Sequence, residues 1–306
     1  MAAKKGELLE RAASHWDAHP ESNKKALITR WWESETLRRL VDLTWYNATG
    51  GCLTSGDYIR RETGRQTLGT GISIGCGAAE DEINLLQQGI LERLILCDVS
   101  NEQLNRAEAY ARKLGIASGR LERRGLVDFD KPLGEKVDLV YWRQSLHHMF
   151  DVRKTLEWCR DGLTPDGAIY CNDACAPNYM QWGEDVLKWS ELYRSTLPRA
   201  YLENPHAPGT FFATRPDVPG IDFWMKHDPT ECADSGNIIP AIRALAPTGR
   251  IAFLGGCIYG FALNDILHNF SDDAAQLENA MRLDKFMSDA GMNCFFTCVL
   301  KRSDFR

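Results

Sequence analysis

Residues 71–80 read GISIGCGAAE, and this stretch decides the fold that the rest of the chain builds on. An apolar run stops at Gly75 and Gly77 and is followed by a helix-forming run, which predicts a buried strand, a tight turn and a helix N-terminus. A second apolar run, residues 93–98, ends at Asp98, about twenty residues beyond the glycines. The pattern is typical of a nucleotide-type βαβ unit whose acid accepts hydrogen bonds from ribose hydroxyls. We therefore expect one cofactor that carries a ribose.

The first turn of the predicted helix indicates which cofactor this is. A dinucleotide would place its pyrophosphate on the helix N-terminus, where N–H groups and the helix dipole favour anions. Here that turn carries Glu80, Asp81 and Glu82, and three carboxylates would repel a phosphate at the same place. Glu80 also stands where the third glycine of G-x-G-x-x-G would be. S-adenosylmethionine, a ribose cofactor with a positive centre and no phosphate, fits this turn better than NAD does.

Composition and charge exclude several other classes of protein. The chain has 306 residues and a formal net charge of −6, which disfavours a nucleic-acid-binding surface. Its N-terminus lacks the apolar segment of a signal peptide, and nowhere do eighteen apolar residues run together. Its ten cysteines include no C-x-x-C pair, which predicts buried thiols. We expect a cytoplasmic protein that binds neither nucleic acid nor membrane; a homodimer is one assembly left open.

Alternating strands and helices predict an α/β fold, a Rossmann-like sheet of seven mostly parallel strands with helices on both faces. The predicted strands are 71–75, 93–98, 120–124, 137–142, 168–173, 250–255 and 294–300. The last of them follows its helix closely and could pair antiparallel. We divide the chain into an N-terminal helical cap (1–66), a cofactor-binding core (67–175), an inserted lid (176–245) and a segment that completes the sheet (246–306). Within the last segment, residues 261–290 look helical.

In an open α/β sheet the ligand lies beyond the carboxyl ends of the strands, so the residues there are the candidates for cofactor binding. Gly77 allows close approach of the backbone, Asp98 would bind the ribose, and Asp128 could accept from the adenine amino group beside the Phe129 ring. The full set of predicted cofactor residues is Gly75, Cys76, Gly77, Asp98, Val99, Asp128, Phe129, Gln144 and Ser145.

With these motifs in hand, the chain resembles the class I S-adenosylmethionine-dependent methyltransferases, and especially a bacterial subgroup that acts on small molecules or glycans. The resemblance covers roughly residues 70 to 300. It rests on SIGCGAAEDE at 73–82, QSLHH at 144–148, PNYMQW at 177–182, and DPTE at 228–231 with Ser235 and Pro240 beyond it. Two positions depart from the superfamily: Ala79 replaces a common glycine, and Ser73 replaces an acid. Tyr259 stands where the subgroup has histidine, which puts substrate choice in doubt.

The reaction that the resemblance implies is an in-line attack by an acceptor on the sulfonium methyl group. Alignment of the two reactants supplies most of the rate, and a base is needed when the nucleophile is a hydroxyl. His147 and His148 follow the fourth strand, and we predict His148 as the base; a purely structural role for both stays open.

Acceptor-side candidates come from the insertion and its surroundings. The predicted acceptor-binding residues are Asp173, Tyr179, Gln181, Trp182 and Tyr259, with His268 as a weaker candidate. A magnesium site from His147, His148, Asp173 and His227 is conceivable, but no spacing requires it, and we predict no metal.

The sequence therefore predicts a methyltransferase that uses S-adenosylmethionine on a small molecule, or on a unit of a glycan or secondary metabolite, at oxygen. Methylation at nitrogen or carbon is the alternative within the same class. A catalytically silent partner protein that only binds S-adenosylmethionine would keep the glycines and Asp98 but need no lid. An NAD-dependent oxidoreductase is disfavoured by the acids of the helix start.

Overall fold

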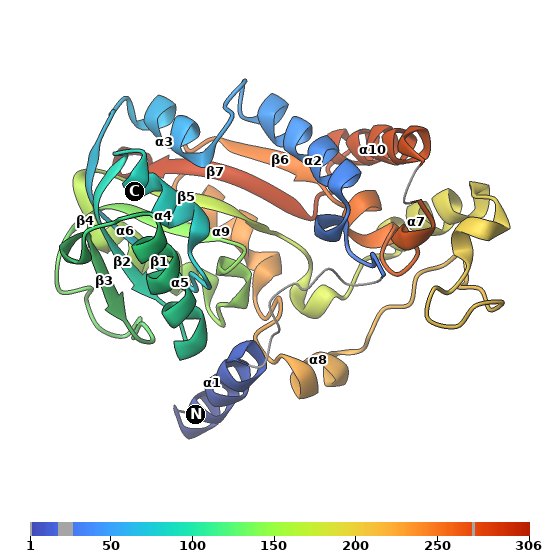
Figure 1. Ribbon diagram of the computed structural model, residues 1–306, viewed down its shortest axis with the longest axis horizontal. Coiled ribbons are helices and arrows are strands. Elements are labelled where there is room, and N and C mark those ends of the chain that lie inside the picture. The colour runs from blue at the N-terminus through green and yellow to red at the C-terminus, as the bar shows by residue number, and fades with distance from the viewer. Residues whose placement is uncertain (1, 18–26, 271–272) are drawn as a thin grey trace.

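The computed structural model describes residues 2–17, 27–270 and 273–306, and its centre is one seven-stranded sheet (Figure 1). The strand order is β3-β2-β1-β4-β5-β7-β6, in which β7 runs antiparallel to both of its neighbours and the remaining pairs are parallel. The strands are β1 (Leu68–Ile74), β2 (Leu91–Cys97), β3 (Leu121–Arg124), β4 (Val137–Arg143), β5 (Leu163–Ala174), β6 (Ile251–Gly255) and β7 (Phe295–Lys301). The predicted Rossmann-like sheet of seven mostly parallel strands is confirmed, and the direction of the last strand, which the sequence left open, is antiparallel.

Helices cover both faces of this sheet. One face packs against α6 (Val152–Gly162) and α9 (Ile238–Leu245), and the other against α3 (Ser55–Thr63), α4 (Glu80–Gln87) and α5 (Asn101–Lys113). Next to β6, α2 (Glu35–Ala48) and α10 (Ala274–Asp289) share a third apolar cluster. The remaining helices are α1 (Ala2–Asp17), α7 (Glu184–Thr196) and α8 (Ile221–His227).

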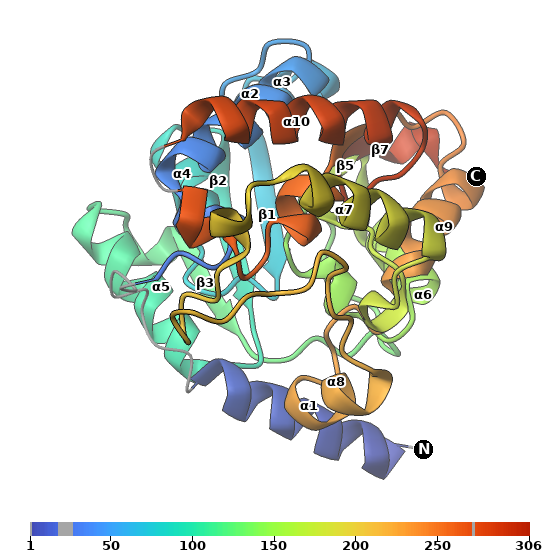
Figure 2. The ribbon, with the colours of Figure 1, turned by 90° about the vertical axis from the view of Figure 1, so that its right-hand side faces the viewer.

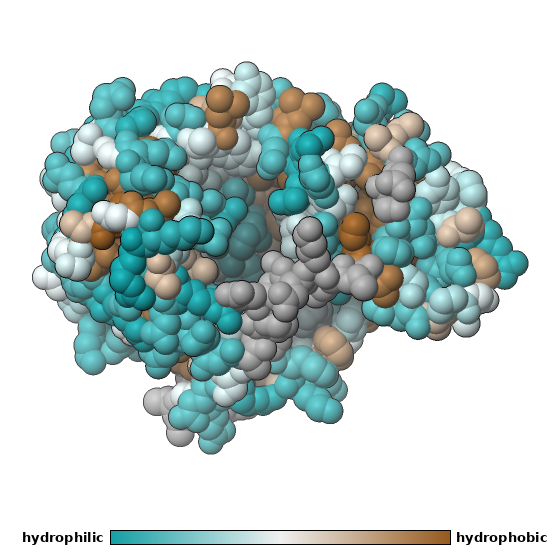
Figure 3. Space-filling view, in the orientation of Figure 1, coloured by the Kyte–Doolittle hydropathy of each residue, from teal (hydrophilic) through white to brown (hydrophobic). Residues whose placement is uncertain are grey.

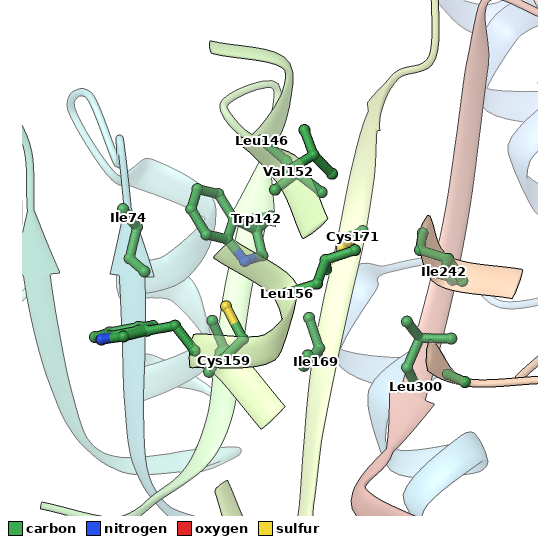
Figure 4. Packing of buried hydrophobic residues seen from close by; sticks show 14 of the residues in the cluster. Ile74, Trp142, Leu146, Val152, Leu156, Cys159, Ile169, Cys171, Ile242 and Leu300 are labelled. Carbon is green, nitrogen blue, oxygen red and sulfur yellow. The ribbon is translucent and has the colours of Figure 1, made fainter. Parts of the chain in front are cut away.

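The apolar centre lies between the sheet and α6. Trp142 of β4 is fully buried there, and Figure 4 shows it beside Ile74 of β1 and the α6 residues Leu156 and Cys159. On the same side Ile242 of α9 packs over β5 and β7. Residues 163–174 and 295–301 therefore have both faces covered, as central strands of a doubly wound sheet require.

Two segments differ from the sequence-based expectation. Residues 261–290 do not form one helix: a π-helical turn (Ile258–Ala262) and a 3₁₀ turn (Leu267–Phe270) precede α10. Asp273 explains the break, because its side chain accepts from the backbone N–H of Gln276 and so starts a new helix. The predicted insertion also contributes a core helix, since α9 packs against the sheet. Of the predicted N-terminal cap, residue 1 and residues 18–26 lie outside the described residues.

A buried acid supports the end of β1. The hydroxyl of Ser73 donates to Glu82 Oε1 at 2.8 Å, and Glu82 is 3% exposed. Burial raises the pKa of Glu82 to about 7, although the Ser73 hydrogen bond opposes the shift. The folded protein therefore takes up a proton at Glu82 at a pH where the unfolded chain would already have lost it.

We predict that Glu82→Gln removes part of the pH dependence of stability. Because the pKa is raised on folding, the wild-type free energy of unfolding should fall by about 1–3 kcal/mol as pH rises from about 4.5 to 7. A neutral amide at this position does not titrate, so the free energy of unfolding of the variant should not fall in this way. The stability of the variant relative to wild type should therefore increase as the pH rises from about 4.5 to 7. Urea unfolding at a series of pH values measures the difference, with the exposed Glu92→Gln as control. Equal pH slopes for Glu82→Gln and wild type would contradict the assignment.

Candidate functional site

The glycine turn after β1 brings two predicted parts of the site together. Gly75 has φ +64°, and a Cβ there would lie 2.8 Å from the Cβ of Ser145, so only glycine fits. Ser145 in turn donates its hydroxyl to the Ile74 carbonyl at 2.8 Å. The loop that carries the histidines is thereby held directly against the glycine turn.

Asp98 at the end of β2 is hydrogen-bonded to the same turn. Its Oδ2 accepts from the backbone N–H of Gly77 at 2.8 Å, and its Oδ1 accepts from that of Ser100 at 2.8 Å. Burial raises the pKa of Asp98, while these hydrogen bonds oppose the rise. Each carboxylate oxygen can accept a further hydrogen bond, which is what binding a ribose diol would require.

Other predicted cofactor residues lie at the same edge of the sheet or further away. Cys76 is buried beside Gly77, and Gln144 is exposed with φ +51° at the end of β4. Val99 directly follows Asp98 and is partly buried. Phe129 packs against Trp158 of α6 in an edge-to-face contact of 5.2 Å, and Asp128 is exposed and forms an ion pair with Lys131 at 3.0 Å. The residues of the glycine turn therefore lie together at the edge of the sheet, whereas Phe129 packs against the apolar cluster under α6.

The sequence-based interpretation assumed that the three acids at the start of α4 form one patch that repels a phosphate. In the structure they do not form such a patch. Glu82 turns inward to Ser73, and Asp81 forms an ion pair with Arg143 at 2.6 Å. Glu80 is exposed. The count of carboxylates therefore overstated their repulsion of a phosphate, because two of them have partners that the sequence alone did not reveal.

The centre of the site is a pair of histidines after β4, of which His147 is buried and His148 is partly buried. His147 and His148 lie with ring centroids 4.2 Å apart, on a 3₁₀ turn (Leu146–His148). His147 Nδ1 donates to Asp173 Oδ1 at 2.5 Å. Asp173 is fully buried at the end of β5, and its Oδ2 also accepts from the backbone N–H groups of Ser145 and Leu146. Asp173 thus positions the histidine loop, a role that its predicted place on the acceptor side did not include.

Sequence reasoning did not assign the residues that complete this centre. His148 Nδ1 lies 2.9 Å from Thr230 Oγ1, and Thr230 donates its own hydroxyl to Asp228 Oδ1 at 2.6 Å. Glu231 Oε2 lies 3.9 Å from His147 Nε2 and 3.8 Å from His148 Nε2. These three residues belong to the DPTE motif, so the signal was present in the resemblance, although nothing in the sequence showed which way it faced.

Opposite pKa shifts separate the two histidines. Burial alone would lower the pKa of His147, but the Asp173 carboxylate outweighs it and raises the pKa to about 9. Burial, together with the nearby His147, lowers the pKa of His148. The pKa of Asp173 is lowered despite burial, because His147 and two backbone N–H groups stabilise its charge. At neutral pH the pair therefore holds one cationic and one neutral imidazole.

Backbone strain gathers in the loops around the histidines. Tyr179 and Met180 have φ of +51° and +53°, and Cys232 has φ +52°. The two strained segments pair directly, because the Tyr179 N–H donates to the Cys232 carbonyl at 2.8 Å. Non-glycine residues in this region cost roughly 1–2 kcal/mol each and tend to persist at functional sites.

The remaining predicted acceptor residues divide into two groups. Tyr179 lies in the strained loop, and Gln181 donates to the carbonyls of Tyr179 and Pro219, which joins two segments of the insertion. Trp182 packs on Phe261 at 4.8 Å. Tyr259 is buried, donates to the Leu254 carbonyl and stacks on Phe295, so it is not brought to the histidine pair. His268 Nδ1 accepts from the Ile28 N–H.

Two helices from opposite parts of the chain cover this side of the site. Arg11 of α1 donates to the carbonyls of Met225 and Lys226 at the end of α8, and Figures 1 and 2 both show the two helices side by side. Trp16 of α1 makes an edge-to-face contact with His148 at 5.6 Å.

The molecular surface in Figure 3, drawn in the orientation of Figure 1, is hollowed near its middle. Within the described residues, every helix is too short or too polar to cross a bilayer.

Comparison with known proteins identifies the core. Residues 72–169, which run from β1 into β5, match the family model of a methyltransferase domain. No curated protein matches the sequence of the chain.

One solved structure shares the fold along nearly the whole chain, and two others match parts of it. The geranyl diphosphate C-methyltransferase from Streptomyces coelicolor A3(2), solved with Mg²⁺, geranyl diphosphate and S-adenosyl-L-homocysteine, has a TM-score of 0.50 at 13% identity; 96% of this chain and 97% of that chain are covered. A Haloferax volcanii methyltransferase complex matches with a TM-score of 0.31 at 23% identity, covering 37% and 48% of the two chains. A Clostridium acetobutylicum methyltransferase matches with a TM-score of 0.36 at 16% identity, covering 47% of this chain and 54% of that chain. The chain thus spans about half the length of these last two.

The family match lies where the glycine turn, Asp98 and the histidine loop meet, and the strand order of the sheet is that of the same class. Residues 72–169 are accordingly identified as a methyltransferase domain, and the sheet that carries them has the fold of the class I S-adenosylmethionine-dependent methyltransferases.

Proposed function

We propose that the protein transfers the methyl group of S-adenosylmethionine to an oxygen atom of a small-molecule acceptor, or of a small unit of a glycan or secondary metabolite. The observation that supports this most is the largely buried histidine pair, which Asp173 holds, which faces Glu231 and which lies directly behind the glycine turn. An acceptor hydroxyl must lose its proton during attack on the methyl group, and an imidazole near neutral pH is suited to take it.

In this proposal the cofactor lies along the carboxyl ends of β1, β2 and β4. Gly77 lets the protein backbone approach the cofactor closely. Asp98 binds the two ribose hydroxyls while keeping its hydrogen bonds to the backbone N–H groups of Gly77 and Ser100. Asp128 and Val99 remain proposed contacts of the adenosine, whereas the contact between Phe129 and Trp158 favours an indirect role for that ring.

The acceptor is proposed to lie between the histidine pair and the insertion, with Tyr179, Gln181 and Trp182 beside it. His148 acts as the general base, because its pKa is lowered and its Nε2 faces the centre of the site. Closure of α1 and α8 over this centre would exclude water, which favours methyl transfer to the acceptor over hydrolysis.

The charge of the site favours a neutral acceptor over a diphosphate such as the geranyl diphosphate of the Streptomyces enzyme. The carboxylates of Asp173, Asp228 and Glu231 surround the histidine pair, so an anionic acceptor would meet a net negative centre. Attack by carbon or nitrogen stays the alternative, and a silent S-adenosylmethionine-binding protein is the rival from another class. Turnover of any acceptor in a screen with labelled methyl donor would separate an enzyme from the silent rival.

We predict that Asp98→Ala weakens binding of S-adenosylmethionine. Loss of the charge-assisted hydrogen bonds to the ribose should cost about 1.5–3 kcal/mol, or roughly ten- to a hundredfold in affinity. Calorimetric titration with S-adenosylmethionine and its demethylated product measures this, with NAD as a ligand that should not bind. The exposed Asp166→Ala serves as control. Unchanged affinity of Asp98→Ala would show that Asp98 does not bind the ribose.

We also predict that His148→Ala lowers turnover about 10²- to 10⁴-fold, the usual contribution of a general base, without changing cofactor affinity. The matched control is His206→Ala, since His206 is exposed outside the site. Initial rates are measured with an acceptor found in the labelled-donor screen, alongside calorimetry with S-adenosylmethionine. If His148→Ala turns over as fast as wild type, the histidine pair is structural.

A further inference from the structure

Three side-chain atoms around the histidine pair converge on one point. His147, His148 and Glu231 each offer one ligand atom within 4.8 Å of the other two. Glu231 Oε2 lies 3.9 Å from His147 Nε2 and 3.8 Å from His148 Nε2. Ligand atoms bound at about 2.0–2.2 Å to one tetrahedral ion lie about 3.3–3.6 Å apart. To bind one ion, Glu231 would therefore move a few tenths of an ångström towards the rings, and the two imidazoles would move together by up to about 1 Å.

The outer hydrogen bonds orient both imidazoles for this task. His147 Nδ1–H donates to Asp173, which turns Nε2 towards the centre. Thr230 gives its hydroxyl proton to Asp228, so its oxygen accepts from His148 Nδ1–H and leaves Nε2 of that ring with its lone pair. Metal-binding histidines almost always carry such a carboxylate or hydroxyl partner on the second nitrogen. A general base needs one ring held in this way, whereas here two rings are held toward the same carboxylate.

Burial and charge agree with a cation at this point. The side chains of His147, His148 and Glu231 are 8%, 14% and 17% exposed, and Asp173 and Asp228 lie directly behind the two rings at 0% and 7%. Three carboxylates in so little solvent are costly unless positive charge compensates them. With both histidines as neutral ligands, a divalent ion would supply that charge.

We propose that His147, His148 and Glu231 bind a divalent transition-metal ion of the Zn²⁺ type. Two imidazole nitrogens and one carboxylate suit zinc and its first-row neighbours, while Mg²⁺ prefers oxygen ligands throughout. This set differs from the one weighed from the sequence: Asp173 supports His147 from outside, and His227 is exposed and stacks on Phe223.

Three protein ligands leave one position open, as in catalytic zinc sites. Resting on the proposed function, we assign this position to the acceptor oxygen. With the ion bound, the acceptor's O–H bond breaks as its oxygen binds the metal, and the proton leaves to solvent. The oxygen then forms the bond to the methyl carbon, and the electron pair of the broken carbon–sulfur bond stays on sulfur. His148 has no nitrogen left to act as base in this state, so the ion takes over that task.

Metal titration of the full-length protein tests the site without any acceptor. Co²⁺ is added to metal-free protein while visible absorption is recorded, and Zn²⁺ binding is measured by calorimetry. We expect one ion per chain, intense absorption typical of four-coordinate Co²⁺, and affinity at least tenfold weaker in Glu231→Gln and in His148→Gln. The control is the double variant His206→Gln/Glu157→Gln. It replaces a histidine and a glutamate at the surface outside the site, and it should bind both ions as the wild type does.

Either absence of Co²⁺ and Zn²⁺ binding at millimolar concentration, or equal affinity in Glu231→Gln and wild type, overturns the proposal. Glu231→Gln keeps the size of the side chain, and its thermal unfolding is compared with that of wild type so that misfolding is recognised; His148→Gln provides the second variant. S-adenosylmethionine titration of the metal-free protein is run in parallel. Failure to bind S-adenosylmethionine would sink the proposed function and leave the metal result standing, so the two failures are distinguishable.

Discussion

The site depends on the carboxylate of Asp173. This single group, fully buried at the end of β5, accepts from His147 Nδ1 and from the backbone N–H groups of Ser145, Leu146 and Ala174. Four donors on one carboxylate make burial of its charge tolerable, and they tie the loop after β4 to the neighbouring strand. Because the donors include two successive N–H groups, the loop can adopt little else than the turn that carries both histidines.

That constraint passes to the cofactor side through a contact between two loops. Ser145 donates to the Ile74 carbonyl and packs where a Cβ on Gly75 would stand. A side chain at Gly75 would push apart the glycine turn and the histidine loop, and with them the two reactants that these loops position in the proposed function. Since in-line transfer depends on near-contact alignment, a displacement of about 1 Å here would cost as much as loss of a catalytic group.

The periodic part of the chain could be predicted because strands and their ends are local features. The ends of the five parallel strands, Gly75, Asp98 and both histidines follow from runs of apolar residues and the residues after them. Glu231 could not be placed, because its position depends on how the insertion folds back over the sheet. The direction of Glu82 likewise depends on its tertiary contact with Ser73, which the acidic first turn does not reveal.

Neutralisation of acids at this edge of the sheet has a consequence for the reaction. Methyl transfer turns a sulfonium into a neutral thioether, so a bare carboxylate near sulfur would stabilise the reactant more than the transition state. In the metal-free protein three such charges are offset: His147 balances Asp173, Arg143 pairs with Asp81, and Glu82 holds a proton up to a pH of about 7. Asp98 lies beside the turn, where its hydrogen bonds to a ribose would be the same before and after transfer. In the proposed function, the contribution of Asp98 therefore belongs to cofactor affinity and hardly to the chemical step, which is left to the groups around the histidine pair.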